Sequence, residues 1–62
     1  MIGFRTRNSV YYVNEKEHII TGGLFEDDKK HYDEITAIIG FKGIIKLSDG
    51  TKIETSTVES YL

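Results

Sequence analysis

Side chains branched at Cβ are the feature that most restricts the fold of this chain. Isoleucine, valine and threonine fill 18 of the 62 positions, whereas alanine occurs once and leucine three times. A β-branched side chain loses rotamer freedom in a helix but packs well on a pleated sheet. Alanine and leucine, the best helix formers, are nearly missing. The sequence therefore predicts an all-β or mostly β protein.

The length of the chain limits how much core it can bury. Residues 1–62 are enough for one single small domain. A chain of this size buries only about 60% of the surface that it exposes when unfolded, so a partner subunit would help it. We expect a small antiparallel sheet or partly open SH3-like barrel of about five strands, with at most one short helix near residues 29–36.

Charge and residue usage exclude several classes of protein. Eight basic and ten acidic residues give a net charge of −2, which argues against a general nucleic-acid binder or an acidic-membrane binder. The chain has no cysteine, so a disulfide framework and a thiolate zinc site are both excluded. No apolar run has the length of a transmembrane span or a signal-peptide core. We expect a cytoplasmic protein that does not contact membranes.

The first hairpin is predicted from alternation over residues 2–7 and 9–13. A two-residue loop at Asn8-Ser9 would set Thr6 opposite Tyr11. The inner face would then consist of Ile2, Phe4, Thr6, Tyr11 and Val13.

The middle of the chain leaves two alternatives open. Residues 18–21 are typical of a short third strand that ends at a pair of glycines. Residues 26–34 carry five acids and two lysines and read as a loop or the start of a helix. For residues 29–36, Asp28 as N-cap and Gly40 as C-terminal stop favour a helix. The β-branched run that begins at Ile35 favours a strand instead.

The second hairpin is the clearest element and spans residues 43–56. A three-residue loop over residues 48–50 sets Ile45 opposite Ile53 and separates the apolar face from the polar face. This loop needs Gly50 in the left-handed region. Residues 57–62 are predicted to form a last strand or a docked tail, held by Val58 and Tyr61.

No constellation of residues predicts an enzyme. The serines lie in no nucleophile pattern, and the carboxylates around His31 are typical of a solvated acidic loop. His31 and these carboxylates also lack the spacing of known metal ligands. We therefore expect no catalytic residue, cofactor or metal site.

Apolar residues on the predicted outer faces point to a protein partner. Val10, Tyr12, Ile19 and Ile44 all fall on solvent faces, which is typical of an association surface for a second copy or for another protein. We expect a homo-oligomer, with a dimer favoured. The candidate partner-binding residues are Arg5, Tyr12, Ile44 and Lys46 on the outer faces, with Glu26, Asp27 and Asp28 in the acidic loop.

Two alternative functions use the basic residues. Basic groups beside an aromatic side chain can grip single-stranded nucleic acid. The residues for a nucleic-acid-binding module would be Arg5, Arg7, Tyr12, Lys42 and Lys46. The other alternative is an oligomeric sponge for a small anionic ligand, in which each subunit supplies Lys46 and Lys52 from facing positions.

Both ends of the chain resemble a group of short proteins encoded by bacteriophages and prophages. Residues 4–14, FRTRNSVYYVN, are similar to their T-x-N-S-x-Y-x-V-D/N start, and residues 49–58 are similar to their D-G…T-S-x-V end. Asn14 stands where many of these proteins have Asp, and Tyr12 where many have Glu. The group has no general assigned activity. The resemblance implies an accessory phage product that binds and modulates or inhibits a host protein, such as a defence system.

Overall fold

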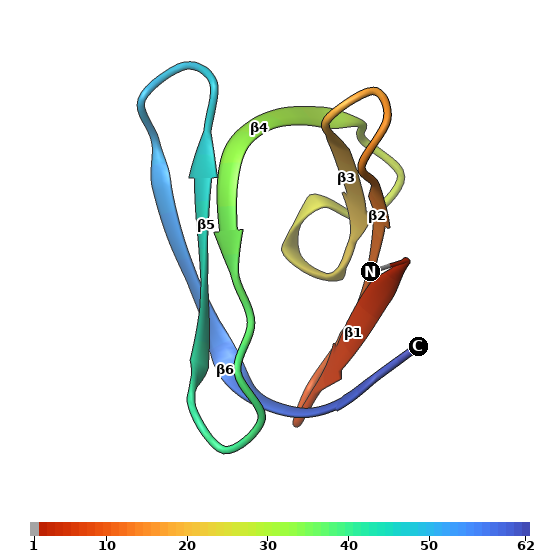
Figure 1. Cartoon of the computed structure of the whole chain (residues 1–62), viewed down its shortest axis with the longest axis vertical. Coiled ribbons are helices and arrows are strands. Elements are labelled where there is room, and N and C mark those ends of the chain that lie inside the picture. The colour runs from red at the N-terminus through yellow and green to blue at the C-terminus, as the bar shows by residue number, and fades with distance from the viewer. Residues whose placement is uncertain (1) are drawn as a thin grey trace.

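The computed structural model describes residues 2–62, which form an all-β barrel. Its strands are β1 (Gly3–Thr6), β2 (Val10–Asn14), β3 (Ile19–Gly22), β4 (Lys30–Thr36), β5 (Lys42–Leu47) and β6 (Lys52–Tyr61), with one 3-10 turn, η1 (Gly23–Phe25), between β3 and β4. Every strand is antiparallel to its neighbours, and β6 pairs with β1 to close the barrel (Figure 1). The predicted small antiparallel β fold is confirmed, with six strands in a closed barrel.

An aromatic cluster fills the barrel beneath β1 and β2. The rings of Phe4 and Tyr11 stack with their centroids 5.1 Å apart, and Phe25 from η1 packs edge-on against Tyr11 at 6.1 Å. The Tyr11 hydroxyl accepts a hydrogen bond from the backbone N–H of Leu24. Gly23 lies against the Tyr11 ring so closely that any side chain at this position would overlap it. The buried apolar residues are Phe4, Tyr11, Val13, Ile20, Phe25, Tyr32, Ala37, Ile45, Leu47 and Val58.

The first hairpin has the predicted faces but a different register. Phe4 lies opposite Tyr11 and Arg5 opposite Val10, so the prediction that Thr6 faces Tyr11 is wrong by two residues. The turn closes between Thr6 and Ser9, where the Thr6 hydroxyl accepts a hydrogen bond from the Ser9 N–H. A two-residue shift keeps each side chain on its own face, because side chains in a strand alternate with a period of two.

One predicted inner residue of this hairpin lies outside the core. Ile2 is 69% exposed, because β1 begins at Gly3 and Ile2 lies beyond the end of the strand. The prediction that Ile2 belongs to the inner face is therefore wrong.

The segment for which the sequence left helix and strand open is a strand. β4 covers Lys30–Thr36 and pairs with β3 on one side and β5 on the other. Tyr32 is buried in this strand, and its N–H donates to the carbonyl of His18. The start of β4 pairs with β3 and the rest of it with β5, and this backbone pairing outweighs the helix signals at Asp28 and Gly40.

The second hairpin agrees with the sequence prediction in register and turn. Ile45 lies opposite Ile53 and Lys46 opposite Lys52. The N–H of Leu47 donates to the carbonyl of Thr51, and Gly50 has a φ of 92°. The predicted left-handed glycine in a three-residue loop is confirmed.

β6 is a single strand of ten residues that makes two different pairings. Its first half pairs with β5 and its second half with β1. Val58 is buried, as predicted for an anchor, whereas Tyr61 is half-exposed and is held by a hydrogen bond from its hydroxyl to the carbonyl of Ala37. Register shifts at Arg5/Thr6 and Lys42/Ile44 accompany these pairings and help the strand to bend around the barrel.

Candidate functional site

The predicted partner-binding residues lie on two different walls of the barrel. Arg5 is on β1 and Tyr12 on β2, whereas Ile44 and Lys46 are on β5. β2 and β5 are separated by two strands in either direction around the six-stranded barrel, so their outer faces point in opposite directions. The seven residues therefore cannot contact one compact partner surface together.

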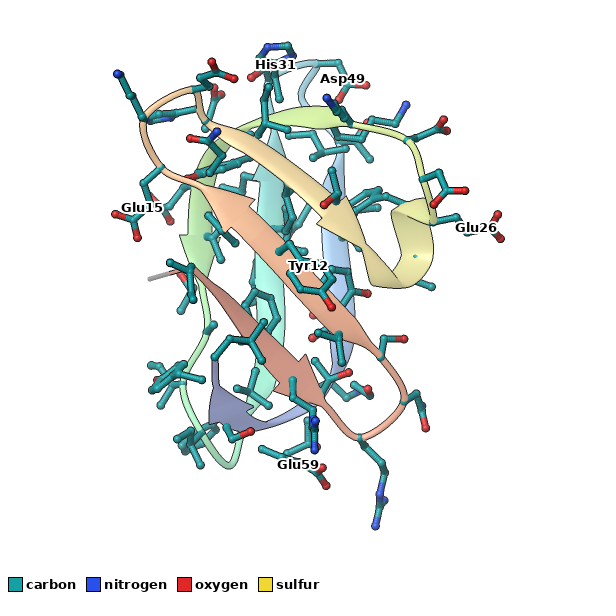
Figure 2. The ribbon with its side chains drawn as sticks, turned by 90° about the vertical axis from the view of Figure 1, so that its right-hand side faces the viewer. Tyr12, Glu15, Glu26, His31, Asp49 and Glu59 are labelled. Carbon is teal, nitrogen blue, oxygen red and sulfur yellow. The ribbon has the colours of Figure 1, made fainter. Side chains whose placement is uncertain are left out.

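Tyr12 is the centre of the first wall. Its side chain is 56% exposed, and Figure 2 shows it in the middle of the face formed by the N-terminal strands. Its partner on β1 is Gly3, which has no side chain to cover the ring. A Cβ added to Gly22 would lie 3.3 Å from Cδ2 of Tyr12, so the ring rests beside the Gly22 backbone. The aromatic ring is thus supported from the sheet and open to solvent.

A shallow hollow lies beside Tyr12 on the outer face of β2 and β3. Its lining combines aromatic, aliphatic and amide groups with one charge of each sign: Tyr12, Val13, Asn14, Glu17, Ile19, Thr21 and Lys29. Asn14 is held in place because its Oδ1 accepts a hydrogen bond from the N–H of Glu17. The hollow is too open to enclose a small substrate, but its mixed lining suits a side chain of another protein.

The acidic loop lies at the edge of the same face. Glu26, Asp27 and Asp28 are exposed and follow η1 directly. Glu26 appears at the border of the view that shows Tyr12 in its centre (Figure 2). The loop is fixed at both ends, because the Glu26 carbonyl accepts from the Gly22 N–H and the Asp28 N–H donates to the carbonyl of Phe25. The structure therefore places the acidic loop on the Tyr12 side of the barrel.

The second wall, on β5, carries a surface ion pair. Nζ of Lys46 lies 3.7 Å from Oε1 of Glu34, and both side chains are exposed. An exposed pair of this kind contributes about 0–1 kcal/mol. Lys52 lies opposite Lys46 on the other side, as the sequence predicted, and Ile44 beside them is half-buried. Because Glu34 neutralises part of this charge, the lysine pair is a weaker anion site than the sequence suggested.

The residues of the nucleic-acid alternative divide in the same way. Arg5 lies on β1, diagonal to Tyr12, and Arg7 lies in the turn after β1. Lys42 and Lys46 lie on β5, on the opposite wall. A single-stranded nucleic acid would have to wrap around the barrel to contact both the two arginines and the two lysines.

The histidines and carboxylates of the described residues are spread over several strands and turns. Within residues 2–62, no group of three or more histidine, cysteine, aspartate or glutamate residues is placed to hold a metal ion. His18 lies in the turn before β3 and stacks on Tyr32, with the ring centroids 5.1 Å apart. Burial raises the pKa of the Tyr32 hydroxyl above its ordinary value, and the negative charge of Glu15 adds to the effect. The described part of the chain also contains no helix with the length and apolar character to span a membrane.

The sequence prediction missed an apolar surface at one end of the barrel. Its exposed side chains come from the loop between β4 and β5 and from both chain ends, and we call this set the apolar end: Ile2, Ile38, Ile39, Phe41, Tyr61 and Leu62. The signal was present in the apolar run of residues 37–39, followed two positions later by Phe41. The β-branched run that begins at Ile35 favours a longer strand in the sequence, whereas β4 ends at Thr36.

Comparison with known proteins adds no family to this description, since no family model, no curated protein and no solved structure matches the chain.

Proposed function

We propose that this chain is a non-enzymatic, phage-type accessory protein that binds and modulates or inhibits a host protein in the bacterial cytoplasm. The phage-type origin and the host partner rest on the resemblance of residues 4–14 and 49–58 to short phage and prophage proteins. The binding mode rests on the outer face of β1, β2 and β3, with Tyr12 as its anchor.

The observation that carries the binding mode is the position of Tyr12. A tyrosine that is 56% exposed in the middle of a rigid sheet offers a large contact area and loses little conformational freedom on binding. The hollow beside it supplies Asn14 and Thr21 as hydrogen-bonding groups and Ile19 as an apolar group. Aromatic anchors of this kind carry much of the binding energy in protein interfaces.

Charges around Tyr12 would orient the partner. Arg5 lies diagonal to Tyr12 in the sheet, and Glu26, Asp27 and Asp28 lie beyond η1 on the same side. A partner that matches this face would carry an acidic group toward β1 and basic groups toward the acidic loop. Such complementarity mainly raises the association rate and selects the orientation of binding.

The test is capture of a partner from bacterial lysate by the tagged protein, with and without nuclease, followed by mass spectrometry. Tyr12→Ala is the test variant. Lys46→Ala is the matched control, because it removes an exposed side chain from the opposite wall. We expect one dominant host protein that survives nuclease treatment, is lost with Tyr12→Ala and is retained with Lys46→Ala.

Other outcomes would overturn parts of the proposal. Loss of the partner with Lys46→Ala alone would place binding on the β5 wall. Capture that disappears with nuclease would favour the nucleic-acid-binding alternative. The affinity of the protein for single-stranded nucleic acid should then fall steeply as the salt concentration rises. A shift in thermal stability with small anionic nucleotides alone would favour the anion sponge.

A further inference from the structure

We propose that the apolar end of the barrel is the interface between two copies of this chain. This inference goes beyond the partner-binding proposal, because it uses a different surface and needs no host protein.

The apolar end is one surface, although its residues come from three parts of the chain. The loop after β4 is attached to β6, because the N–H of Gly40 donates to the carbonyl of Val58 and the N–H of Val58 donates to the carbonyl of Phe41. The C-terminus is attached to β1, because the N–H of Leu62 donates to the carbonyl of Gly3. Figure 1 shows the β4–β5 loop and the final part of β6 crossing at the same end of the barrel.

The exposed area is large for a protein of this size. The six side chains are between 44% and 69% exposed. At roughly 100 Å² for each half-exposed large side chain, they offer about 600 Å² per copy, at the upper limit of apolar patches on monomers. Two copies that meet through this surface would bury about 1,200 Å², which reaches the range of specific, stable interfaces.

Three polar groups within the apolar end have partners inside the chain. The Tyr61 hydroxyl donates to the carbonyl of Ala37 at 2.7 Å, so its ring can be covered without leaving an unpaired hydroxyl. The N–H of Phe41 donates to the carbonyl of Ile38, and the N–H of Gly40 is bonded to β6. Removing water from these three groups therefore has a low desolvation cost, which suits the core of an interface.

The charges that border the apolar end favour a second copy over a partner of one charge sign. Lys42 lies opposite Thr57 and Arg5 opposite Ser60, so one cation from each neighbouring strand flanks the segment of β6 that carries Glu59. A border with both signs is self-complementary under a two-fold rotation, in which the cation of one copy faces the carboxylate of the other.

The experiment is sedimentation equilibrium of the pure protein over a micromolar to millimolar concentration series. Phe41→Glu and Ile39→Lys are the test variants, since both side chains are at least half exposed and lie outside the buried core. Leu24→Glu is the matched control, because Leu24 is 64% exposed, close to the 66% of Phe41, and lies in η1. Circular dichroism confirms that each variant is folded.

We expect twice the mass of one chain at high concentration and a thermal midpoint that rises with concentration. Phe41→Glu and Ile39→Lys should each weaken the dimer by at least about tenfold, whereas Leu24→Glu should not. A protein that stays at the mass of one chain throughout, or a dimer that only Leu24→Glu disrupts, would overturn the inference. No partner is present, so this outcome is independent of the partner-capture experiment.

Discussion

Glu26 occupies a backbone conformation that side chains rarely adopt. Its φ is 53° and its ψ is −120°, in a turn closed by the hydrogen bond from the Asp28 N–H to the Phe25 carbonyl. Such a conformation costs on the order of 1–3 kcal/mol for a residue other than glycine. We therefore expect Glu26→Gly to raise the free energy of unfolding by about 1 kcal/mol, after the greater unfolded-state entropy of glycine offsets part of the gain. The urea midpoint of unfolding measures this change.

The neighbouring residue provides the control for Glu26. Asp27 is also exposed but has no positive φ, so Asp27→Gly should lower stability rather than raise it. A lower urea midpoint for Glu26→Gly would show that the turn does not strain residue 26. If Glu26→Gly stabilises the protein but weakens partner capture, the glutamate side chain serves binding at the expense of stability.

At the scale of the element, the β5–β6 hairpin makes a prediction about pH. Two hydrogen bonds from Thr51 lower the pKa of the Asp49 carboxyl below its ordinary value of 3.8. The bond from the Thr51 side chain has the larger effect, and the bond from the Thr51 backbone has the smaller one. Between the folded and unfolded pKa of Asp49, the unfolded chain therefore binds more protons than the folded chain. The stabilisation from the ionised Asp49 carboxyl is present above pH 3.8 and is lost as pH falls through the folded pKa. We expect Asp49→Asn to reduce the loss of stability on acidification, measured by thermal unfolding as a function of pH.

The source of this pKa shift can be tested separately. The Asp49 Oδ1 accepts from the Thr51 N–H at 2.8 Å, and this bond survives in Thr51→Val because the backbone is retained. Thr51→Val should move the pKa of Asp49 part of the way back toward its ordinary value in a carboxyl titration followed by NMR. An unchanged Asp49 pKa in Thr51→Val would mean that the side-chain hydroxyl has no role.

At the scale of the whole molecule, β6 decides whether the barrel closes. The strand pairs with β5 before Val58 and with β1 from Val58 onward. A chain that ends at residue 57 would lose the buried Val58 side chain and leave β1 with a free edge. We expect this shortened chain to lose cooperative thermal unfolding and to aggregate. A chain that ends at residue 60 is the control and should still unfold cooperatively, since it keeps Val58 and the pairing of Arg5 with Ser60. Cooperative unfolding of the shorter chain would show that closure is dispensable.

Local patterns predicted most of the fold. Only a three-residue loop around Asp49-Gly50 separates apolar from charged side chains, and the observed pairing of Ile45 with Ile53 agrees with this prediction. The faces of the first hairpin were predicted for the same reason. The register of the first hairpin was not predicted. The Thr6 hydroxyl closes the turn on Ser9 and also accepts a hydrogen bond from Ser56 on β6. That contact joins residues 50 positions apart and leaves no local signal.

The candidate site was less predictable than the fold. The sequence placed Arg5 and Tyr12 on a solvent face, and both are exposed there. The sequence placed Ile44 and Lys46 with Arg5 and Tyr12 among the candidate partner-binding residues. A strand pattern shows whether a side chain lies on the inner or the outer face, but not toward which side of the closed barrel it points. The apolar end was missed because the exposure of Ile38, Ile39 and Phe41 depends on where β4 stops pairing.

The amino-acid sequence by itself determined the β character of this protein, the inner face of each hairpin apart from Ile2, and the turn at Gly50. These properties follow from rotamer preferences, a period of two and one left-handed residue, all of which act over a few positions. Only the tertiary structure decided that residues 30–36 form a strand, that β6 closes the barrel on β1 and that Tyr12 and Lys46 face opposite ways. Those properties depend on backbone pairing between segments that are far apart in the sequence. Patterns over a few neighbouring residues do not indicate which distant segments pair.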